Sequence, residues 1–276
     1  MTAAAARAAH LIVDEPPFIF ADTRAADLLG DRADELLGYH RQHAAHPILA
    51  TARGQVICRS RYAEDRLEAA VARGVRQYVL LGAGLDTFAY RAPLAAKLRV
   101  FEVDHPRTQE WKRSSLAAAQ ISIPPEVVFV PADLAADALG EVLTAAGFDF
   151  SAPAAISWLG VTMYLDRAAI GRTLAVLARC APGTELVADY MLPESLRDKT
   201  GSFYASQVMA AAADGGEPWL SFLAPGEMAR LLAEHGFRQA AHVTQRASVP
   251  AELWQRSDAL QPVELSMIAR ARLGGA

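Results

Sequence analysis

Two glycines and two carboxylates between residues 76 and 105 have the spacing of a nucleotide-binding site. The apolar run Tyr78–Leu81 is typical of a strand, and it ends at Gly82-Ala83-Gly84, where glycine lets the backbone turn tightly and approach a ligand closely. A second such run, Arg99–Val103, brings Glu102 and Asp104 to 18 and 20 residues after Gly84. A doubly wound sheet places the acid that binds a ribose diol at about this distance. We therefore expect a ligand that carries a ribose.

The residues after the second glycine argue against a dinucleotide. A glycine at position 87 would complete the dinucleotide fingerprint, but the chain has Asp86 and Thr87 here. The carboxylate of Asp86 would repel a pyrophosphate, whereas it would attract an ammonium group. S-adenosylmethionine has a ribose, an adenine and an ammonium but no phosphate. The sequence therefore favours S-adenosylmethionine over NAD, and a glycine-rich turn that binds nothing is the simpler alternative.

Composition indicates a globular protein and narrows the classes of partner. Of the 276 residues, 52% are apolar and 21% are charged, which suits a chain that folds around a core. The formal charge of −4 and the isoelectric point near 6.0 argue against nucleic acid as a partner. The longest apolar stretch, Ala154–Leu165, is too short to cross a bilayer, so no membrane span is expected.

Cysteines and histidines give no sign of a disulfide or a metal site. Cys58 and Cys180 lie in unrelated segments, and we interpret both as reduced thiols of a cytoplasmic protein without a signal peptide. His40, His43 and His46 recur every third residue, but no cysteine or second carboxylate completes a set of ligands. We interpret these histidines as solvated side chains of a helix and expect no metal.

From residue 76 onward, strand-like and helix-like segments alternate, which predicts an α/β fold with a doubly wound, mostly parallel sheet. The expected strands are Gln77–Leu81, Arg99–Val103, Val127–Pro131, Ala155–Leu159, Glu185–Asp189, Phe237–Val243 and Leu265–Arg272. The last two could form a hairpin. The clearest helices are Arg167–Cys180, with Asp166 as its N-cap, and Pro225–His235.

We divide the chain into a mainly helical segment, residues 1–70, and a core of residues 71–276. Within the core, residues 192–224 contain bends at Gly215-Gly216 and Pro218 and no clear strand or long helix. The segment also carries aromatic residues, whose large apolar side chains favour contact with other groups over exposure to solvent: Phe203, Tyr204, Trp219 and Phe222. We expect an insertion at the acceptor site that closes as a mobile lid, and an ordinary packed helical insertion is the alternative.

Five motifs follow one another along the chain: Gly-Ala-Gly-Leu-Asp-Thr at 82–87, Phe-Glu-Val-Asp-His-Pro at 101–106, Pro-Ala-Asp-Leu at 131–134, Trp-Leu-Gly-Val-Thr-Met-Tyr-Leu at 158–165 and Ala-Asp-Tyr at 188–190. With them the chain resembles the leucine carboxyl methyltransferase superfamily over roughly residues 2–272, and most of all its bacterial branch of small-molecule O-methyltransferases. The resemblance implies a class I methyltransferase (Rossmann-like) fold. Such a fold has a seven-stranded sheet with an antiparallel last strand, here with residues 1–70 as a helical cap over the donor pocket.

The resemblance assigns contacts to the methionine and ribose portions of S-adenosylmethionine. Gly82 and Gly84 would let the backbone reach the methionine portion. Asp104 matches the ribose-binding acid of the family, and Glu102 is close enough to compete for that role. Both carboxylates could instead cap the helix that starts after Pro106.

Further contacts follow from the same resemblance. Asp133 and Leu134 fall where the family binds the adenine amino group and packs the ring, although Asp133 could also be a helix N-cap. Arg59 matches the partner of the donor carboxylate, a bidentate role that suits a guanidinium. Arg7 is a weaker match for a second cation from the cap.

One position departs from the family pattern. Many members have a glutamate at the end of the fourth strand, where this chain has Leu159. A contact to the donor ammonium is lost there. Either Asp86 and backbone carbonyls such as that of Gly160 replace it, or donor affinity is reduced, or the site no longer catalyses.

Methyl transfer is an in-line displacement, so the enzyme has to align the acceptor and exclude water. A carboxylate acceptor is already ionised at pH 7 and needs no general base, only a group that orients it. Tyr164, Tyr190 and Arg91 are candidates for that role, although the tyrosines could be core residues. A phenolic acceptor would need a base, and His105 is expected to face the adenine instead.

The sequence thus predicts an S-adenosylmethionine-dependent O-methyltransferase that acts on a carboxylate or acidic hydroxyl of a small molecule, such as a secondary metabolite. An NAD(P)-dependent dehydrogenase and a non-catalytic S-adenosylmethionine-binding protein are the alternatives. A small-molecule acceptor is the expected partner, and both a monomer and a homodimer are compatible with the sequence.

Overall fold

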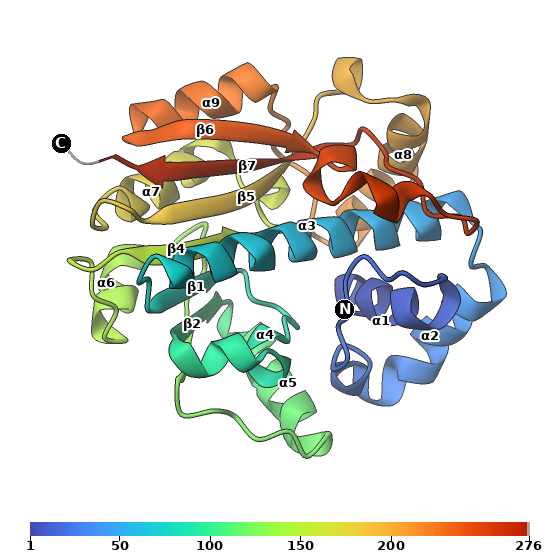
Figure 1. Ribbon diagram of the computed structural model, residues 1–276, viewed down its shortest axis with the longest axis horizontal. Helices are drawn as coiled ribbons and strands as arrows, with labels where there is room; N and C mark the ends of the chain where they lie inside the picture. Colours follow the sequence, from blue (N-terminus) through green and yellow to red (C-terminus); the bar gives the residue numbers. More distant parts are fainter. Residues whose placement is uncertain (275–276) are drawn as a thin grey trace.

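A seven-stranded sheet crosses the molecule in the order β3-β2-β1-β4-β5-β7-β6 (Figure 1). The computed structural model describes residues 1–274, so the last two residues of the predicted core lie outside the described residues. The strands are β1 (Gln77–Leu81), β2 (Arg99–Asp104), β3 (Val127–Pro131), β4 (Ala154–Trp158), β5 (Glu185–Met191), β6 (Phe237–Thr244) and β7 (Ser266–Leu273). β1 to β5 pair in parallel, and β7 runs antiparallel to both β5 and β6. The predicted antiparallel last strand is confirmed.

Helices cover both faces of the sheet, and α3 runs along one of them (Figure 1). The α-helices are α1 (Thr2–Val13), α2 (Ala33–Gln42), α3 (Pro47–Ala72), α4 (Phe88–Arg91), α5 (Pro106–Ala118), α6 (Leu139–Ala145), α7 (Arg167–Leu177), α8 (Lys199–Asp214) and α9 (Pro225–Glu234). Short 3-10 turns lie at Asp27–Arg32, Pro93–Lys97, Thr162–Tyr164, Glu194–Leu196, Arg246–Ser248 and Ala251–Trp254.

Apolar side chains hold these layers together on both faces of the sheet. All residues of β1 are buried: Val79 and Leu81 pack with α6, α7 and α9, whereas Tyr78 and Leu80 pack with α3 and α4. Strands that are buried on both faces appear in a sequence as near-continuous apolar runs. The strand predictions agree with the observed strands to within one or two residues.

Two connections differ from expectation. β6 and β7 are antiparallel neighbours, but residues 245–265 between them contain two 3-10 turns, so the pair is not a tight hairpin. In the 192–224 segment, the expectation of no long helix is wrong, because α8 spans 16 residues and the Asp198 side chain caps it. Trp219 is only 9% exposed and packs with Met163 and Met191. The segment thus contains a helix and a packed tryptophan, as the alternative of a helical insertion predicts, and closure as a mobile lid stays a prediction.

Residues 1–70 form helices that pack together through a buried charged group. Arg53 on α3 is fully buried and donates to both carboxylate oxygens of Asp14, at 2.8 and 2.9 Å. Its Nη1 also lies 3.3 Å from His40 of α2. Burial and the charge of Arg53 lower the pKa of His40 to about 4. The interpretation of His40 as a solvated histidine is therefore wrong, and it is a neutral packing residue.

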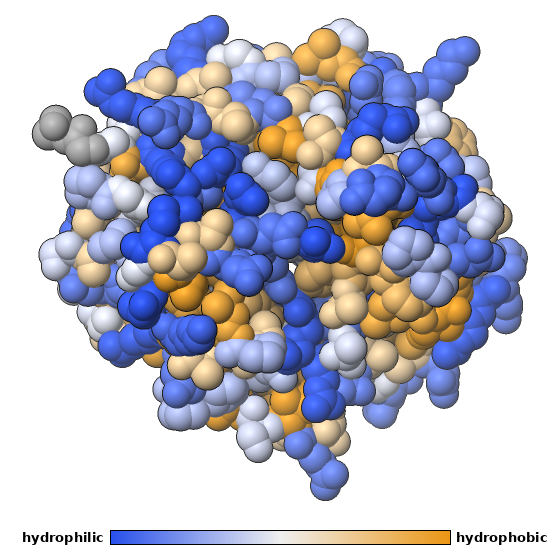
Figure 2. All heavy atoms as spheres, viewed as in Figure 1, coloured by the Kyte–Doolittle hydropathy of each residue, from blue (hydrophilic) through white to orange (hydrophobic). Residues whose placement is uncertain are grey.

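Figure 2 shows the face of the molecule on which α3 lies, where hydrophilic side chains separate apolar patches. Within residues 1–274, no helix combines the length and apolar character needed to cross a membrane. The same part of the chain contains no group of three or more His, Cys, Asp or Glu side chains that could hold a metal ion.

Candidate functional site

A cavity of about 630 Å³ opens at the carboxyl ends of the parallel strands. We call it the inner cavity. Its walls come from α1, from α3, from the loops after β1 to β4 and from residues 216–220 after α8. Every residue predicted to contact the donor lines it except Glu102: Arg59, Gly82, Gly84, Asp86, Asp104, Asp133, Leu134 and Gly160. The topology thus brings together residues that are up to 101 positions apart in the sequence.

The glycine turn after β1 forms one wall of the inner cavity. Gly82 and Gly84 have φ angles of +70° and +47°, which are strained for other residues. A Cβ atom on Gly82 would lie 2.3 Å from Cγ2 of Val161 in the loop after β4. The amides of Gly82 and Ala83 donate to the carbonyl oxygen of Val103 at 2.8 and 3.0 Å. Glycine is therefore required at position 82 for both conformation and space.

The two carboxylates of β2 have different surroundings. Asp104 lines the inner cavity and accepts hydrogen bonds from the amides of Gly84, at 2.5 Å, and His105, at 2.7 Å. Glu102 is 1% exposed and forms an ion pair of 2.7 Å with Lys112 of α5. Glu102, predicted as a donor contact, does not line the inner cavity, because it lies two residues before the end of β2, where Lys112 of α5 covers it.

Two other predicted acids each cap a turn with one carboxylate oxygen. Oδ1 of Asp86 accepts the amide of Phe88 at the start of α4, at 2.8 Å. Oδ1 of Asp133 accepts the amide of Ala135, also at 2.8 Å. Because both side chains line the inner cavity, their capping roles leave the second oxygen available for a ligand.

Arg59 meets the loop after β4 at the inner cavity. Gly160 has a φ angle of +71°, and a Cβ atom on it would lie 2.4 Å from Nη2 of Arg59. Nη1 of Arg59 forms an ion pair of 2.9 Å with Asp189 at the end of β5. Leu159 also lines the cavity, at the position where the family pattern has a carboxylate. From the sequence, Asp189 belongs to the motif at 188–190 and is predicted at most as a turn residue at the end of a strand.

Of the three predicted acceptor-orienting residues, only Tyr164 faces the inner cavity. Burial raises the pKa of the Tyr164 phenol, so the hydroxyl stays protonated at neutral pH and can donate a hydrogen bond. Tyr190 is 1% exposed, and its hydroxyl lies 2.8 Å from Nδ1 of His242. Side chains alternate along a strand, so Tyr190 and Asp189 face opposite sides of β5. Tyr190, predicted as an acceptor contact, therefore does not line the inner cavity.

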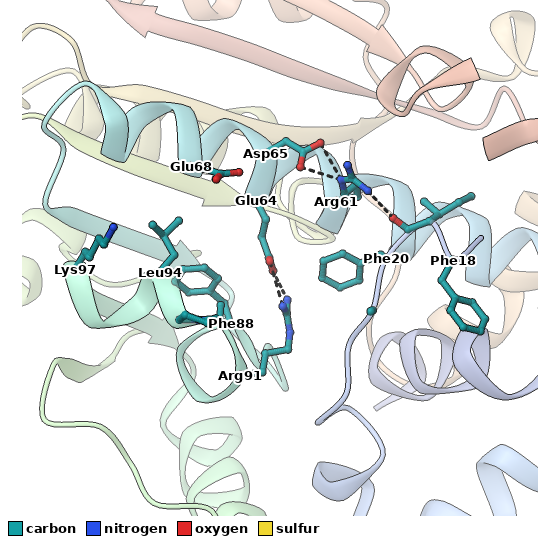
Figure 3. A pocket seen from close by; sticks show the side chains of 14 residues that line it. Phe18, Phe20, Arg61, Glu64, Asp65, Glu68, Phe88, Arg91, Leu94 and Lys97 are labelled. Atoms are coloured by element: carbon teal, nitrogen blue, oxygen red, sulfur yellow. Dashed lines mark hydrogen bonds and ion pairs between the residues drawn. The ribbon is translucent and has the colours of Figure 1, made fainter. Parts of the chain in front are cut away.

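Arg91 lies in a different cavity, of about 590 Å³, between α3, α4 and residues 18–21. We call it the outer cavity. Figure 3 shows Arg91 and Glu64 of α3 pointing toward one another across it. Arg91 also donates to the hydroxyl of Thr87 at 3.0 Å and stacks over the ring of Phe20. Arg91, predicted as an acceptor contact, therefore does not line the inner cavity.

A buried ionic network separates the two cavities. Arg7, which lines the inner cavity, donates to Asp22 and to the carbonyl oxygen of Leu85, both at 2.6 Å. Asp22 also accepts the Thr87 hydroxyl at 2.5 Å and lies 3.5 Å from Arg91. Burial alone would raise the pKa of Asp22, but Arg7 and Thr87 outweigh it and hold that pKa below its usual value. The cap is thereby fixed to the loop that follows the glycine turn.

Comparisons with known proteins agree with this geometry. The profile of the family described as "Leucine carboxyl methyltransferase" matches residues 1–178. The "Putative S-adenosyl-L-methionine-dependent methyltransferase YktD" of Bacillus subtilis is 35% identical over 190 residues, which cover 68% of this chain and 62% of that protein. A Mycobacterium tuberculosis protein with the same general description is 34% identical over 212 residues, which cover 71% and 65%. The chain thus spans less than two thirds of the length of these relatives.

Among solved structures, a protein from Thermobifida fusca described as a "putative methyltransferase" has a TM-score of 0.60 to this chain. The two sequences are 20% identical, and the match covers 94% of this chain and 97% of the other. At this identity the likeness concerns the fold alone. The predicted class I fold is confirmed by this match together with the strand order.

Proposed function

The chain belongs to the leucine carboxyl methyltransferase family, and on that basis we propose that it is an S-adenosylmethionine-dependent O-methyltransferase of small molecules. One observation carries the proposal: the glycine turn, Asp86, Asp104 and Arg59 line a single cavity. The relatives from Bacillus and Mycobacterium carry the description of methyltransferases that depend on this donor, which supports the same activity here.

The donor set of the inner cavity fits S-adenosylmethionine group by group. Asp104 would accept the ribose hydroxyls, and Arg59 would bind the carboxylate of the methionine portion. Asp86 would bind the ammonium of the methionine portion, because Leu159 carries no charge. Asp133 and Leu134 would hold the adenine. Gly82 and Gly84 line the cavity without side chains, which suits a ligand that lies against the turn.

When bound, the sulfonium supplies the methyl group; the residues of the chain have to position and shield the acceptor. Tyr164 is the hydroxyl that faces the cavity, and its protonated phenol would donate to an acceptor oxygen. A donor of this kind orients a carboxylate or an acidic hydroxyl, which needs no general base at neutral pH. We therefore keep this class of acceptor, now with Tyr164 alone in the orienting role.

Two further features are part of the proposal. Residues 1–70 act as the cap of the donor site, since the first turn of α1 and Arg7 line the inner cavity. Cys58 and Cys180 are both free and buried, which fits a cytoplasmic protein.

Ligand binding tests the donor, and product analysis tests the chemistry. S-adenosylhomocysteine at 100 times its dissociation constant should stabilise the fold by about 2.7 kcal/mol in a thermal unfolding experiment. NADH should give no shift, and the reverse result would contradict the proposal in favour of a dehydrogenase. Incubation with labelled donor and a library of small acids and phenols should then give methylated products by mass spectrometry. Binding without any product would indicate a donor-binding protein that does not catalyse.

A further inference from the structure

Asp189 is a buried carboxylate with both oxygens engaged at the edge of the inner cavity. Its side chain is 2% exposed. Oδ2 accepts Nη1 of Arg59 at 2.9 Å, and Oδ1 accepts the amide of Gly160 at 2.6 Å. The hydroxyl of Thr162 donates to the backbone carbonyl of Asp189 at 2.6 Å. One residue of β5 therefore fixes both an arginine of α3 and the loop after β4.

The contact between Arg59 and Gly160 leaves no room for a side chain. A Cβ atom on Gly160 would lie 2.4 to 3.0 Å from three atoms of the guanidinium. The guanidinium is thus held flat against the loop that lines the cavity, with 14% of the Arg59 side chain exposed. Within residues 1–274, Asp189 is the protein acceptor for Arg59, so its other N–H groups remain for a ligand.

We propose that Asp189 is a positioning residue that aims Arg59 at the carboxylate of the methyl donor. The inference rests on the proposed function and deepens it. Parallel pairing aligns Trp158 with Ala188, so the next residues, Leu159 and Asp189, lie side by side at the strand ends. Leu159 lines the cavity but carries no charge. The negative charge at these strand ends comes from Asp189, which is paired with Arg59. Because both of its oxygens are engaged and buried, Asp189 acts on the donor through Arg59 and does not touch it.

Two ligands that differ in their amino-acid portion can distinguish a positioning role of Asp189 from a general contribution to the stability of the fold. S-adenosylhomocysteine carries the carboxylate that Arg59 would bind, whereas 5′-methylthioadenosine lacks it. In Asp189→Asn, the amide can accept only one of the two bonds that Asp189 accepts, so the guanidinium loses its fixed position. By calorimetry, the variant should bind S-adenosylhomocysteine about 10- to 100-fold more weakly and 5′-methylthioadenosine within about threefold of wild type.

Arg59→Ala removes the other partner of the ion pair. It tests the proposal even if the Asp189→Asn variant does not fold. It should show the same preference, and the double variant should bind S-adenosylhomocysteine no more weakly than Arg59→Ala alone, because the two residues act as a unit. Asp149→Asn is the control: it removes a carboxylate that accepts the backbone amide of Ser151 before the amino end of β4, at the opposite edge of the sheet from the inner cavity. It should leave both affinities unchanged.

The outcomes separate the two proposals. Wild-type protein that binds neither ligand overturns the proposed function and this role with it. If the wild type binds both ligands, an equal loss of both in Asp189→Asn, or no loss of either, overturns the positioning role alone. Additive losses in the double variant overturn it as well.

Discussion

The inner and outer cavities have similar volumes, about 630 and 590 Å³, but they use their polar groups differently. In the outer cavity, Arg91 and Glu64 pair with each other, and Arg61 pairs with Asp65 (Figure 3). In the inner cavity, Asp86 and Asp133 each keep an oxygen that no backbone amide occupies, and Arg59 keeps free N–H groups. Size therefore does not distinguish the two cavities. The pairing of their less exposed charged groups does, since Glu68 and Lys97, which also line the outer cavity, are exposed to solvent.

The same contrast occurs within one strand. Glu102 is paired and buried, whereas Asp104, two residues later, lines the inner cavity. We therefore expect Glu102→Gln to reduce the free energy of unfolding by about 3–5 kcal/mol, because Lys112 is left buried without its carboxylate. Asp104→Asn should instead weaken S-adenosylhomocysteine binding about 10- to 100-fold, with a small loss of stability. Urea unfolding and calorimetry on both variants check this, and an exchange of the two phenotypes would reverse the assignment.

Gly82→Ala should produce the next largest effect, on binding. The new Cβ atom would meet Val161 at 2.3 Å, and the φ angle of +70° is unfavourable for alanine. The turn has to shift, so affinity for S-adenosylhomocysteine should fall about 100-fold, or about 3 kcal/mol. Gly74→Ala is the control, since that glycine has a φ angle of +100° but a Cβ atom on it would meet no other group within 4 Å. It should lose stability and keep affinity; equal binding losses would refute a steric cause.

Part of the fold and of the inner cavity was predictable because local sequence determines it, whereas Arg59, Asp133 and Leu134 were assigned by resemblance to a family. An apolar run such as Tyr78–Leu81 requires burial on both faces, and the turn at Gly82 and the acid at Asp104 have a fixed spacing along the chain. The fold then places the ends of parallel strands at one edge. No long-range contact is needed to locate these residues.

The acceptor side was not predictable for a different reason. Whether Tyr190 faces the cavity depends on which side of β5 is covered by α3, and its hydroxyl bonds to His242 instead. Arg91 pairs with Glu64, which lies 27 positions earlier in the chain, and local sequence does not predict such a contact. Asp189 was missed because its partner Arg59 lies 130 residues away. Side chains alternate along a strand, so a correct assignment of Asp189 to the cavity side of β5 would have placed Tyr190 on the other side.

The network between the cavities should contribute to stability in a pH-dependent way. Asp22→Asn should cost about 2–3 kcal/mol at pH 7, because Arg7 and Arg91 lose a buried carboxylate. The pKa of Asp22 is held below its usual value, so its contribution is present above that usual value and is lost as the pH falls through the lowered one. Urea unfolding of wild type and variant between pH 7 and 3 should show the difference shrink below about pH 4. A difference that grows with acid would mean that the pKa of Asp22 is raised in the folded protein.

Arg91 tests whether the outer cavity is structural. Arg91→Met should cost about 2 kcal/mol, since Glu64 loses its partner in a partly buried site. The double variant Arg91→Met and Glu64→Met should regain most of that stability, because replacing a buried ion pair with apolar groups is often neutral. S-adenosylhomocysteine affinity should stay within about twofold of wild type in both variants. Loss of affinity in the stable double variant would mean that the two cavities are coupled.

The smallest effect is expected at Tyr164, the single predicted acceptor contact that faces the inner cavity. With an acceptor found by the labelled-donor screen, Tyr164→Phe should reduce kcat/KM for that acceptor about tenfold, or about 1.4 kcal/mol, as expected for one lost hydrogen bond. Donor affinity should not change. Tyr190→Phe removes a hydroxyl of the same kind that bonds to His242, so it should lower stability and leave turnover unchanged. If Tyr190→Phe impaired turnover more than Tyr164→Phe, the acceptor would have to approach from the other face of β5, and the distinction between spare and engaged groups would fail there.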